Sequence, residues 1–218
     1  MNEQGLFWAL AATAAAVGAL HSIAPDHWVP FTAVARARGW TAGRTAQVTL
    51  LCGFAHVTVS VVLGLLALVL GQEVLEAFGA RLESVAGILL VGFGLVYGLL
   101  GLRRTAGRRL HGHSHAHYDH VHDPSRATVA GLFLLFAADP CVRLIPIMIA
   151  AAPLGWAPLT ALIAIYEAAT LSAMVAIVLP ARAGVVRALQ APWLDRYGDA
   201  VAGAAIVATG IVVSALGF

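Results

Sequence analysis

The sequence predicts an all-α integral membrane protein of six transmembrane helices, arranged as two inverted three-helix repeats. Of its 218 residues, 60% are hydrophobic and only 11% are charged, and the mean hydropathy is +0.86. A soluble domain of this length cannot bury so much apolar side chain, because much of any folded surface faces water. The apolar residues also form runs of about 20 residues, the length that a helix needs to cross a bilayer. A third observation, a similarity between the two halves, predicts the repeats.

Six apolar runs separated by polar segments define the predicted spans. They cover residues 5–28, 46–71, 82–102, 128–152, 157–180 and 198–218. All 13 basic residues are Arg, and apart from Arg81 and Arg143 they lie in the first, third and fifth loops. The positive-inside rule therefore predicts a multi-pass protein of the cell membrane with both termini outside. The net charge of +2 follows from this asymmetry and does not indicate a nucleic-acid partner.

Two short motifs recur at a similar spacing in the two halves. PDHWVP at 25–30 parallels PCVRLIP at 140–146, and Gly39–Trp40 parallels Gly155–Trp156. Each half contains an odd number of predicted spans, so the second half must enter the membrane in the opposite sense. Inverted repeats with broken helices are typical of transporters, whose substrate site lies near the membrane midplane. The chain is therefore divided into a first membrane repeat, a His-rich polar loop and a second membrane repeat, at residues 1–102, 103–127 and 128–218.

The end of the first span carries His21, Asp26 and His27 in otherwise apolar surroundings. An ionisable side chain at membrane depth is costly unless it is paired, which makes these residues a candidate site. On an unbroken helix, residues five or six apart would diverge by about 120–140°. Pro25 has no N–H for the His21 carbonyl and pushes Ala24 towards an extended conformation, so we expect the first helix to be broken near Pro25. The unwound turn would bring the three side chains onto one ion and leave the His21 carbonyl free as a further ligand.

His56, in the second span, is a further candidate ligand. Imidazole together with carboxylate suits nickel, cobalt or zinc better than calcium or magnesium, which prefer oxygen ligands. One alternative is that the first cluster is a helix end at the membrane interface, with His27 and Trp28 among the lipid headgroups. The alternative for His56 is a hydrogen-bonded core histidine. Three such residues around a proline, opposite a fourth, favour a metal site made of His21, Asp26, His27 and His56.

The second half contains further candidate residues inside its predicted spans, namely Asp139, Cys141, Arg143 and Glu167. We expect Arg143 to pair with Asp139 or Glu167, since pairing offsets the cost of burying a charge. Cys141 falls opposite Asp26 when the two repeats are aligned. It is therefore a further candidate metal ligand, with inert packing as the alternative.

The polar segment 103–127 contains six of the nine histidines. They are His111, His113, His115, His117, His120 and His122. Alternating histidines bind borderline divalent ions in a flexible and weakly selective way. We expect a cytosolic linker that collects metal; the alternatives are a pH-sensitive linker and an unused insert.

The motif HSIAPDH (21–27) resembles that of the nickel/cobalt transporter superfamily (NiCoT and NicO-like proteins), in which a His is followed after four residues by Asp–His. GFAHVTVSV (53–61) is similar to the family's second motif, with His56 as its histidine. The chain looks closest to the smaller six-span NicO-type branch, because the importers usually have eight spans and a longer first motif. The His-rich loop is similar to that of the efflux members. The resemblance implies nickel or cobalt as a transported substrate and no permanently bound cofactor.

Several alternatives remain open from the sequence. Efflux is favoured because a cytosolic collector concentrates ions on the side from which they leave, and metal uptake through the same site is the alternative. A membrane thiol–disulfide electron carrier is another, since DPCVRLIP (139–146) resembles a half-site of the carriers used in cytochrome c maturation; Cys52, however, is not next to a proline. A membrane hydrolase or desaturase would need more ligands, so we predict no enzyme. The sequence contains no GxxxxGK[ST] motif, so nothing in it indicates ATP as the driving force. The sequence allows an oligomer but does not indicate one.

Overall fold

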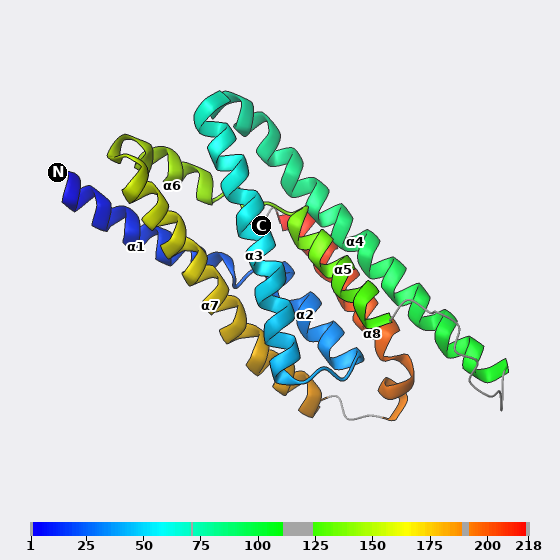
Figure 1. The fold of residues 1–218 in the computed structure, drawn as a ribbon. Helices are drawn as coiled ribbons and strands as arrows, with labels where there is room; N and C mark the ends of the chain where they lie inside the picture. Colours follow the sequence, from blue (N-terminus) through cyan, green and yellow to red (C-terminus); the bar gives the residue numbers. More distant parts are fainter. Residues whose placement is uncertain (1, 71, 111–123, 189–191, 217–218) are drawn as a thin grey trace.

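The computed structural model describes residues 2–70, 72–110, 124–188 and 192–216 (Figure 1). Within these ranges the chain is helical and contains no strand, which confirms the predicted all-α class. The elements are α1 (Glu3–His21), α2 (Pro25–Ala37), α3 (Ala42–Leu70), α4 (Gln72–Leu110), α5 (Pro124–Ala137), α6 (Leu144–Ala151), the 3-10 turn η1 (Ala152–Leu154), α7 (Trp156–Ala188) and α8 (Pro192–Leu216).

Five of the described helices contain segments long and apolar enough to cross a membrane. These are Glu3–His21, Ala42–Leu70, Gly87–Ala106, Trp156–Arg187 and Arg196–Ala215. Large apolar side chains point outward from them, such as Val69 and Ile88, which are 81% and 66% exposed. Polar side chains such as Thr49 and Ser60 are instead fully buried in the interior. An apolar outside around a partly polar inside is what a chain solvated by lipid requires, and it indicates a membrane protein.

Two of the six predicted spans are interrupted. The first ends at His21 and the chain resumes a helix at Pro25, as predicted. The fourth was predicted as continuous over 128–152, and this is wrong, because α5 ends at Ala137 and α6 begins at Leu144. Pro140 lies in the interruption, where it has no N–H with which to continue a helix. Neither α5 nor α6 alone reaches the length of a membrane span.

Helical structure extends further into the predicted polar loop than expected. α4 continues to Leu110 and α5 begins at Pro124, so the segment 103–127 is not a linker throughout. The six loop histidines fall within 111–123, which lie outside the described residues.

A left-handed glycine follows the interrupted segment in each half. Gly39 and Gly155 have φ of 60° and 91°, a backbone region that a residue without a Cβ adopts at little cost. Each is followed by a tryptophan, Trp40 or Trp156, close to the start of the long helix α3 or α7. The two halves thus share a sequence of a broken segment, a left-handed glycine and a long helix.

Small residues allow close packing between helices of the two halves. Helices α4 and α8 lie side by side (Figure 1), and a Cβ placed on Gly203 would be 2.5 Å from Cα of Gly98 and 2.6 Å from the carbonyl oxygen of Gly94. Helices α1 and α7 also pack together, and a Cβ on Gly18 would be 2.9 Å from the carbonyl oxygen of Tyr166. Glycine at such positions is the usual means by which membrane helices approach one another.

The buried apolar side chains form two clusters. One includes Cys52 and Phe136, and the other includes Cys141 and Val57. Helix α3 contributes to both, since Cys52 and Val57 belong to different clusters on the same helix. Along this helix His56 lies between these two cluster members, directly before Val57.

Candidate metal centre

The turn between α1 and α2 determines where the first three candidate ligands lie. His21 is the last residue of α1, and Asp26 and His27 lie in the first turn of α2. Ala24 has an extended backbone with φ −56° and ψ 136°, as the residue before a proline prefers. Pro25 is the first residue of α2, where its missing N–H costs no helical hydrogen bond. The break therefore has the cause that the sequence predicted.

The carbonyl of His21 is not free, contrary to the expectation from the sequence. The N–H of Ala24 donates to it over 3.1 Å, which closes a tight turn. Ser22 fixes this turn against the second half of the chain, because its hydroxyl lies 2.9 Å from the carbonyl oxygen of Gly18 and 3.2 Å from that of Thr170 on α7. The side chains rather than this carbonyl are therefore the candidate ligands.

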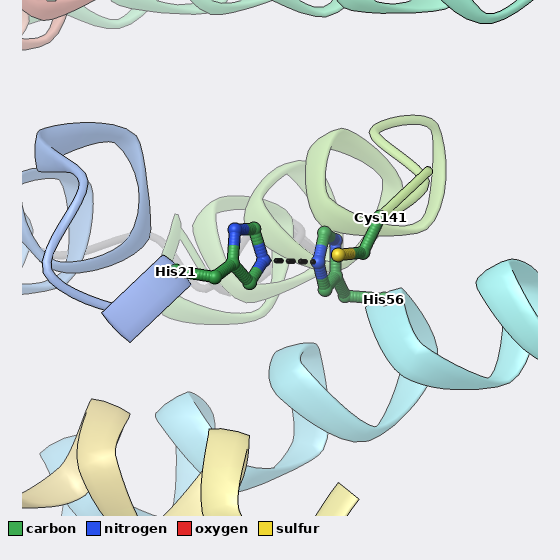
Figure 2. A group of neighbouring side chains, drawn as sticks. All are labelled: His21, His56 and Cys141. Atoms are coloured by element: carbon green, nitrogen blue, oxygen red, sulfur yellow. Dashed lines mark hydrogen bonds between the residues drawn. The ribbon is translucent and has the colours of Figure 1, made fainter. Parts of the chain in front are cut away.

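The imidazoles of His21, His27 and His56 lie against one another in the interior. Their ring centroids are separated by 4.0 Å for His21 and His27, 5.1 Å for His27 and His56, and 5.6 Å for His21 and His56. The exposed fractions of the three residues are 7%, 2% and 1%. Nε2 of His21 and Nε2 of His56 are 3.3 Å apart (Figure 2). The structure thus brings together residues from the α1–α2 turn and from the middle of α3.

Asp26 accompanies His27 rather than facing the other two rings. Its Oδ1 lies 3.0 Å from Nδ1 of His27, and the residue also lines a small cavity together with Asp139. A carboxylate beside one ring nitrogen orients an imidazole whose other nitrogen binds metal. Both ring nitrogens of His27 are buried and make no hydrogen bond of good geometry among the described residues, so the 3.0 Å contact with Asp26 is an ion-pair distance and Nε2 has no partner. The geometry therefore fits Asp26 as an orienting residue and His27 as a donor.

Cys141 joins the histidines from the second half, where it lies in the interruption between α5 and α6 (Figure 2). The potential ligand atoms of His21, His56 and Cys141 all lie within 4.8 Å of one another, and all three residues are buried. The sequence analysis treated Cys141 as a lesser candidate than Asp26. The structure reverses this order, because Cys141 and not Asp26 completes the tightest group of donors among the described residues.

Two residues that the sequence analysis did not identify hold Cys141 in place. Its backbone N–H donates to Oγ of Ser60 over 2.6 Å, and this hydroxyl donates to the carbonyl of His56 over 2.7 Å. Its Sγ lies 2.7 Å from Oη of Tyr166 on α7, and both Ser60 and Tyr166 are fully buried. The position of Ser60 four residues after His56, on the same helix face, is a sequence signal that could have identified it. No comparable signal marked Tyr166.

Arg143 contributes a cation next to the site. Its Nη1 lies 3.0 Å from Nδ1 of His21, a contact that the sequence analysis did not expect when it matched Arg143 with Asp139 or Glu167. Arg143 and His21 line a cavity of about 580 Å³ at the end of α1. The ring of His21 therefore has one nitrogen directed to Arg143 and the other to His56.

No protein-family model, curated protein or solved structure matches the chain. The candidate site of this chain contains three buried imidazoles, one thiol and one carboxylate, gathered where two predicted spans are interrupted. Donors of this kind suit a borderline transition-metal ion better than a hard cation such as magnesium.

Proposed function

We propose that this chain transports divalent transition-metal ions, nickel or cobalt, across a cell membrane, as its resemblance to the NicO-type branch of the nickel/cobalt transporters implies. The observation that carries the proposal is the convergence of His21, His27 and His56 within an apolar interior. A buried polar group without a partner costs about 1–3 kcal/mol, and Nε2 of His27 is such a group. A bound metal ion would accept the lone pairs of the ring nitrogens and remove that cost.

The proposed architecture is six spans in two inverted three-helix repeats, in which α1 with α2 and α5 with α6 each form one broken span. Two features shared by the broken spans support it. Each broken span has a proline in or beside its interruption, Pro25 or Pro140, and each is followed by a left-handed glycine, Gly39 or Gly155. Broken helices that meet near the midplane are how secondary transporters build a substrate site.

The cavities beside the site support alternating access. The one that reaches His21 and Arg143 measures about 580 Å³, whereas the one beside Asp26 and Asp139 measures about 10 Å³. The smaller volume is about the room that one water molecule needs. We propose that this state is open towards His21 and nearly closed towards Asp26. Rocking of one repeat against the other would close the first side and open the second.

Orientation and direction follow from the charge pattern of the loops. With both termini outside, the His-rich loop is cytosolic, where it collects ions for export. Efflux is therefore the proposed direction, and uptake through the same site is the outcome that would reverse it. Transport leaves the covalent bonds of the substrate unchanged, so the proposed function includes no enzyme activity.

The thiol–disulfide carrier receives no support from the positions of the cysteines. Cys52 and Cys141 are both buried free thiols, and they belong to different apolar clusters. A dithiol relay needs two thiols that can approach bonding distance. Metal transport is the function that uses the histidines around Cys141, whereas a relay would leave them without a role.

Transport in proteoliposomes tests the proposal, with nickel, cobalt, zinc and manganese compared. His21→Ala, His27→Ala and Asp26→Ala should each reduce transport to the level of empty liposomes, because each removes a ligand or its orientation. His56→Ala should also impair it. Ser172→Ala, exposed on α7, is the matched control and should transport normally. Near-normal transport in two of the first three variants, with insertion intact, would refute the site.

A further inference from the structure

The donor atoms that lie closest together are two imidazole nitrogens and one sulfur. They belong to His21, His56 and Cys141, come from three different elements, and lie within 4.8 Å of one another in the interior (Figure 2). His27 adds an unpartnered, fully buried Nε2 in the adjacent ring. This set differs from the His–Asp–His set that the sequence motif suggested, because it contains a thiol and its nearest members contain no carboxylate.

The spacing of the two imidazole nitrogens indicates a coordination geometry. Metal–nitrogen bonds of about 2.0–2.1 Å at tetrahedral angles place two ligand nitrogens about 3.3–3.4 Å apart, whereas right angles would place them about 2.8–3.0 Å apart. Nε2 of His21 and Nε2 of His56 are separated by 3.3 Å. This is the separation of a hydrogen-bonded pair without an ion, and a tetrahedral ion would bind between the two nitrogens with less displacement than an octahedral or square-planar one.

The sulfur of Cys141 is held towards this position from two sides. Ser60 accepts the hydrogen bond of the Cys141 backbone N–H and ties it to the His56 carbonyl on α3. Tyr166 lies with its Oη 2.7 Å from Sγ, so the phenol O–H can donate to a thiolate once the ion has displaced the thiol proton. Ser60 and Tyr166 are both fully buried, so the surrounding packing holds these two contacts of Cys141 in place.

We propose that His21, His56 and Cys141 form a His₂Cys site that supplies three donors of a tetrahedral ion, with the adjacent Nε2 of His27 as the fourth, and that selects thiolate-accepting ions, cobalt(II) and zinc, over nickel and manganese. Cys141 is a metal ligand and Tyr166 is a positioning residue that acts through it. Thiolate and imidazole at tetrahedral angles suit zinc and cobalt, whereas nickel prefers square-planar or octahedral surroundings and manganese prefers oxygen. On binding, the metal–sulfur bond replaces the S–H bond and the thiol proton is released to solvent water, so no oxidant or reductant takes part. The inference rests on the proposed transport site and changes its substrates from nickel or cobalt to cobalt and zinc.

Cobalt(II) absorption of the purified, detergent-solubilised protein tests the sulfur ligand directly. The unaltered protein should develop a sulfur-to-cobalt charge-transfer band in the near ultraviolet together with the intense visible bands of tetrahedral cobalt. Cys141→Ala should abolish the charge-transfer band and lower cobalt and zinc affinity more than about 100-fold, since even an outer partner of a metal ligand is worth about 10–100-fold. Cys52→Ala is the matched control, because it removes the other buried thiol and should keep the band.

Two further variants separate loss of a ligand from loss of the fold. Cys141→His supplies an imidazole in place of the thiol, so it should bind cobalt without the charge-transfer band. Tyr166→Phe should retain the band at a shifted energy, with affinity reduced by about 10–100-fold. A Tyr166→Phe variant with an unchanged band and unchanged affinity would remove the positioning role.

The outcomes distinguish this inference from the transport proposal. If the unaltered protein binds cobalt through nitrogen alone, without a sulfur band, the His₂Cys site is wrong and the transport site stands. If the protein binds none of the four ions, both are wrong. In proteoliposomes, the unaltered protein should carry cobalt and zinc faster than nickel. Cys141→His should reduce the ratio of the cobalt and zinc transport rates to the nickel transport rate. A preference for nickel over cobalt and zinc in the unaltered protein would overturn the selectivity.

Discussion

The guanidinium of Arg143 lies 3.0 Å from Nδ1 of His21, whose other ring nitrogen faces His56. A guanidinium is always a hydrogen-bond donor, so Nδ1 of His21 is the acceptor and the ring proton is on Nε2. A metal ion at Nε2 requires the proton to move to Nδ1, which then becomes a donor. Two donors cannot share this contact, so Arg143 must release His21 when the ion binds. Because Arg143 lies two residues after Cys141, we expect metal loading of the proposed site to act on the interruption between α5 and α6.

We predict that Arg143→Ala increases metal affinity. The substitution removes a cation beside the site and a donor that competes for His21. Two unit charges 4 Å apart interact by about 4 kcal/mol at an effective dielectric constant of 20, so even a partly relaxed arrangement should yield at least about a tenfold increase. Isothermal titration calorimetry with cobalt measures it, and Arg187→Ala, exposed near the end of α7, is the control. Unchanged or weaker binding would mean that Arg143 does not compete with the ion.

A second prediction concerns Pro25. Pro25→Ala removes the constraint that keeps Ala24 extended and allows α1 to continue into α2, which turns His21 and His27 onto divergent faces. We expect metal affinity to fall while thermal stability is kept or increased. Calorimetry and a thermal melt of the same preparation measure the two quantities. Unaltered affinity would show that the proline does not maintain the site.

A third prediction concerns the packing of α4 on α8. Gly203→Ala places a Cβ 2.5 Å from the backbone of Gly98, and since backbone cannot move as a side chain can, we expect a loss of about 1–3 kcal/mol of stability. Gly92→Ala on α4 serves as the control, because a Cβ at this position has no neighbouring atom within 4 Å. It should be neutral or stabilising by up to about 1 kcal/mol, because alanine favours a helix. Equal melting temperatures of the two variants in detergent would argue against the close approach.

The fourth prediction concerns the His-rich loop. Deletion of residues 111–122 should weaken protection of expressing cells against cobalt or nickel chiefly at low metal concentration, because a collector matters least when the ion is abundant. Growth and cellular metal content measure this, with a loop of equal length in which the histidines are replaced by Ser as control for spacing. Higher metal content in expressing cells than in empty-vector cells would reverse the direction to uptake and leave the site argument intact.

The sequence by itself determined the properties that depend on local chemistry. Long apolar runs predict membrane helices wherever they occur, because the cost of exposing or burying a segment depends on its own composition. Pro25 predicts the break in the first span, since a missing N–H and a clash with the preceding turn act within a few residues. The same rule applied to Pro140 would have divided the fourth span, which the sequence analysis predicted as continuous over 128–152.

Only the tertiary structure decided which donors meet. His21 and His56 are 35 positions apart, and Arg143 contacts His21 across 122 positions. Such contacts depend on how far each helix is rotated about its axis and how closely it approaches its neighbour, and glycines such as Gly18 set that approach through the absence of a side chain. The choice of Cys141 over Asp26 as the nearest third donor follows from the same packing: Asp26 is directed to His27 and a narrow cavity, whereas Ser60 and Tyr166 hold Cys141 beside the rings.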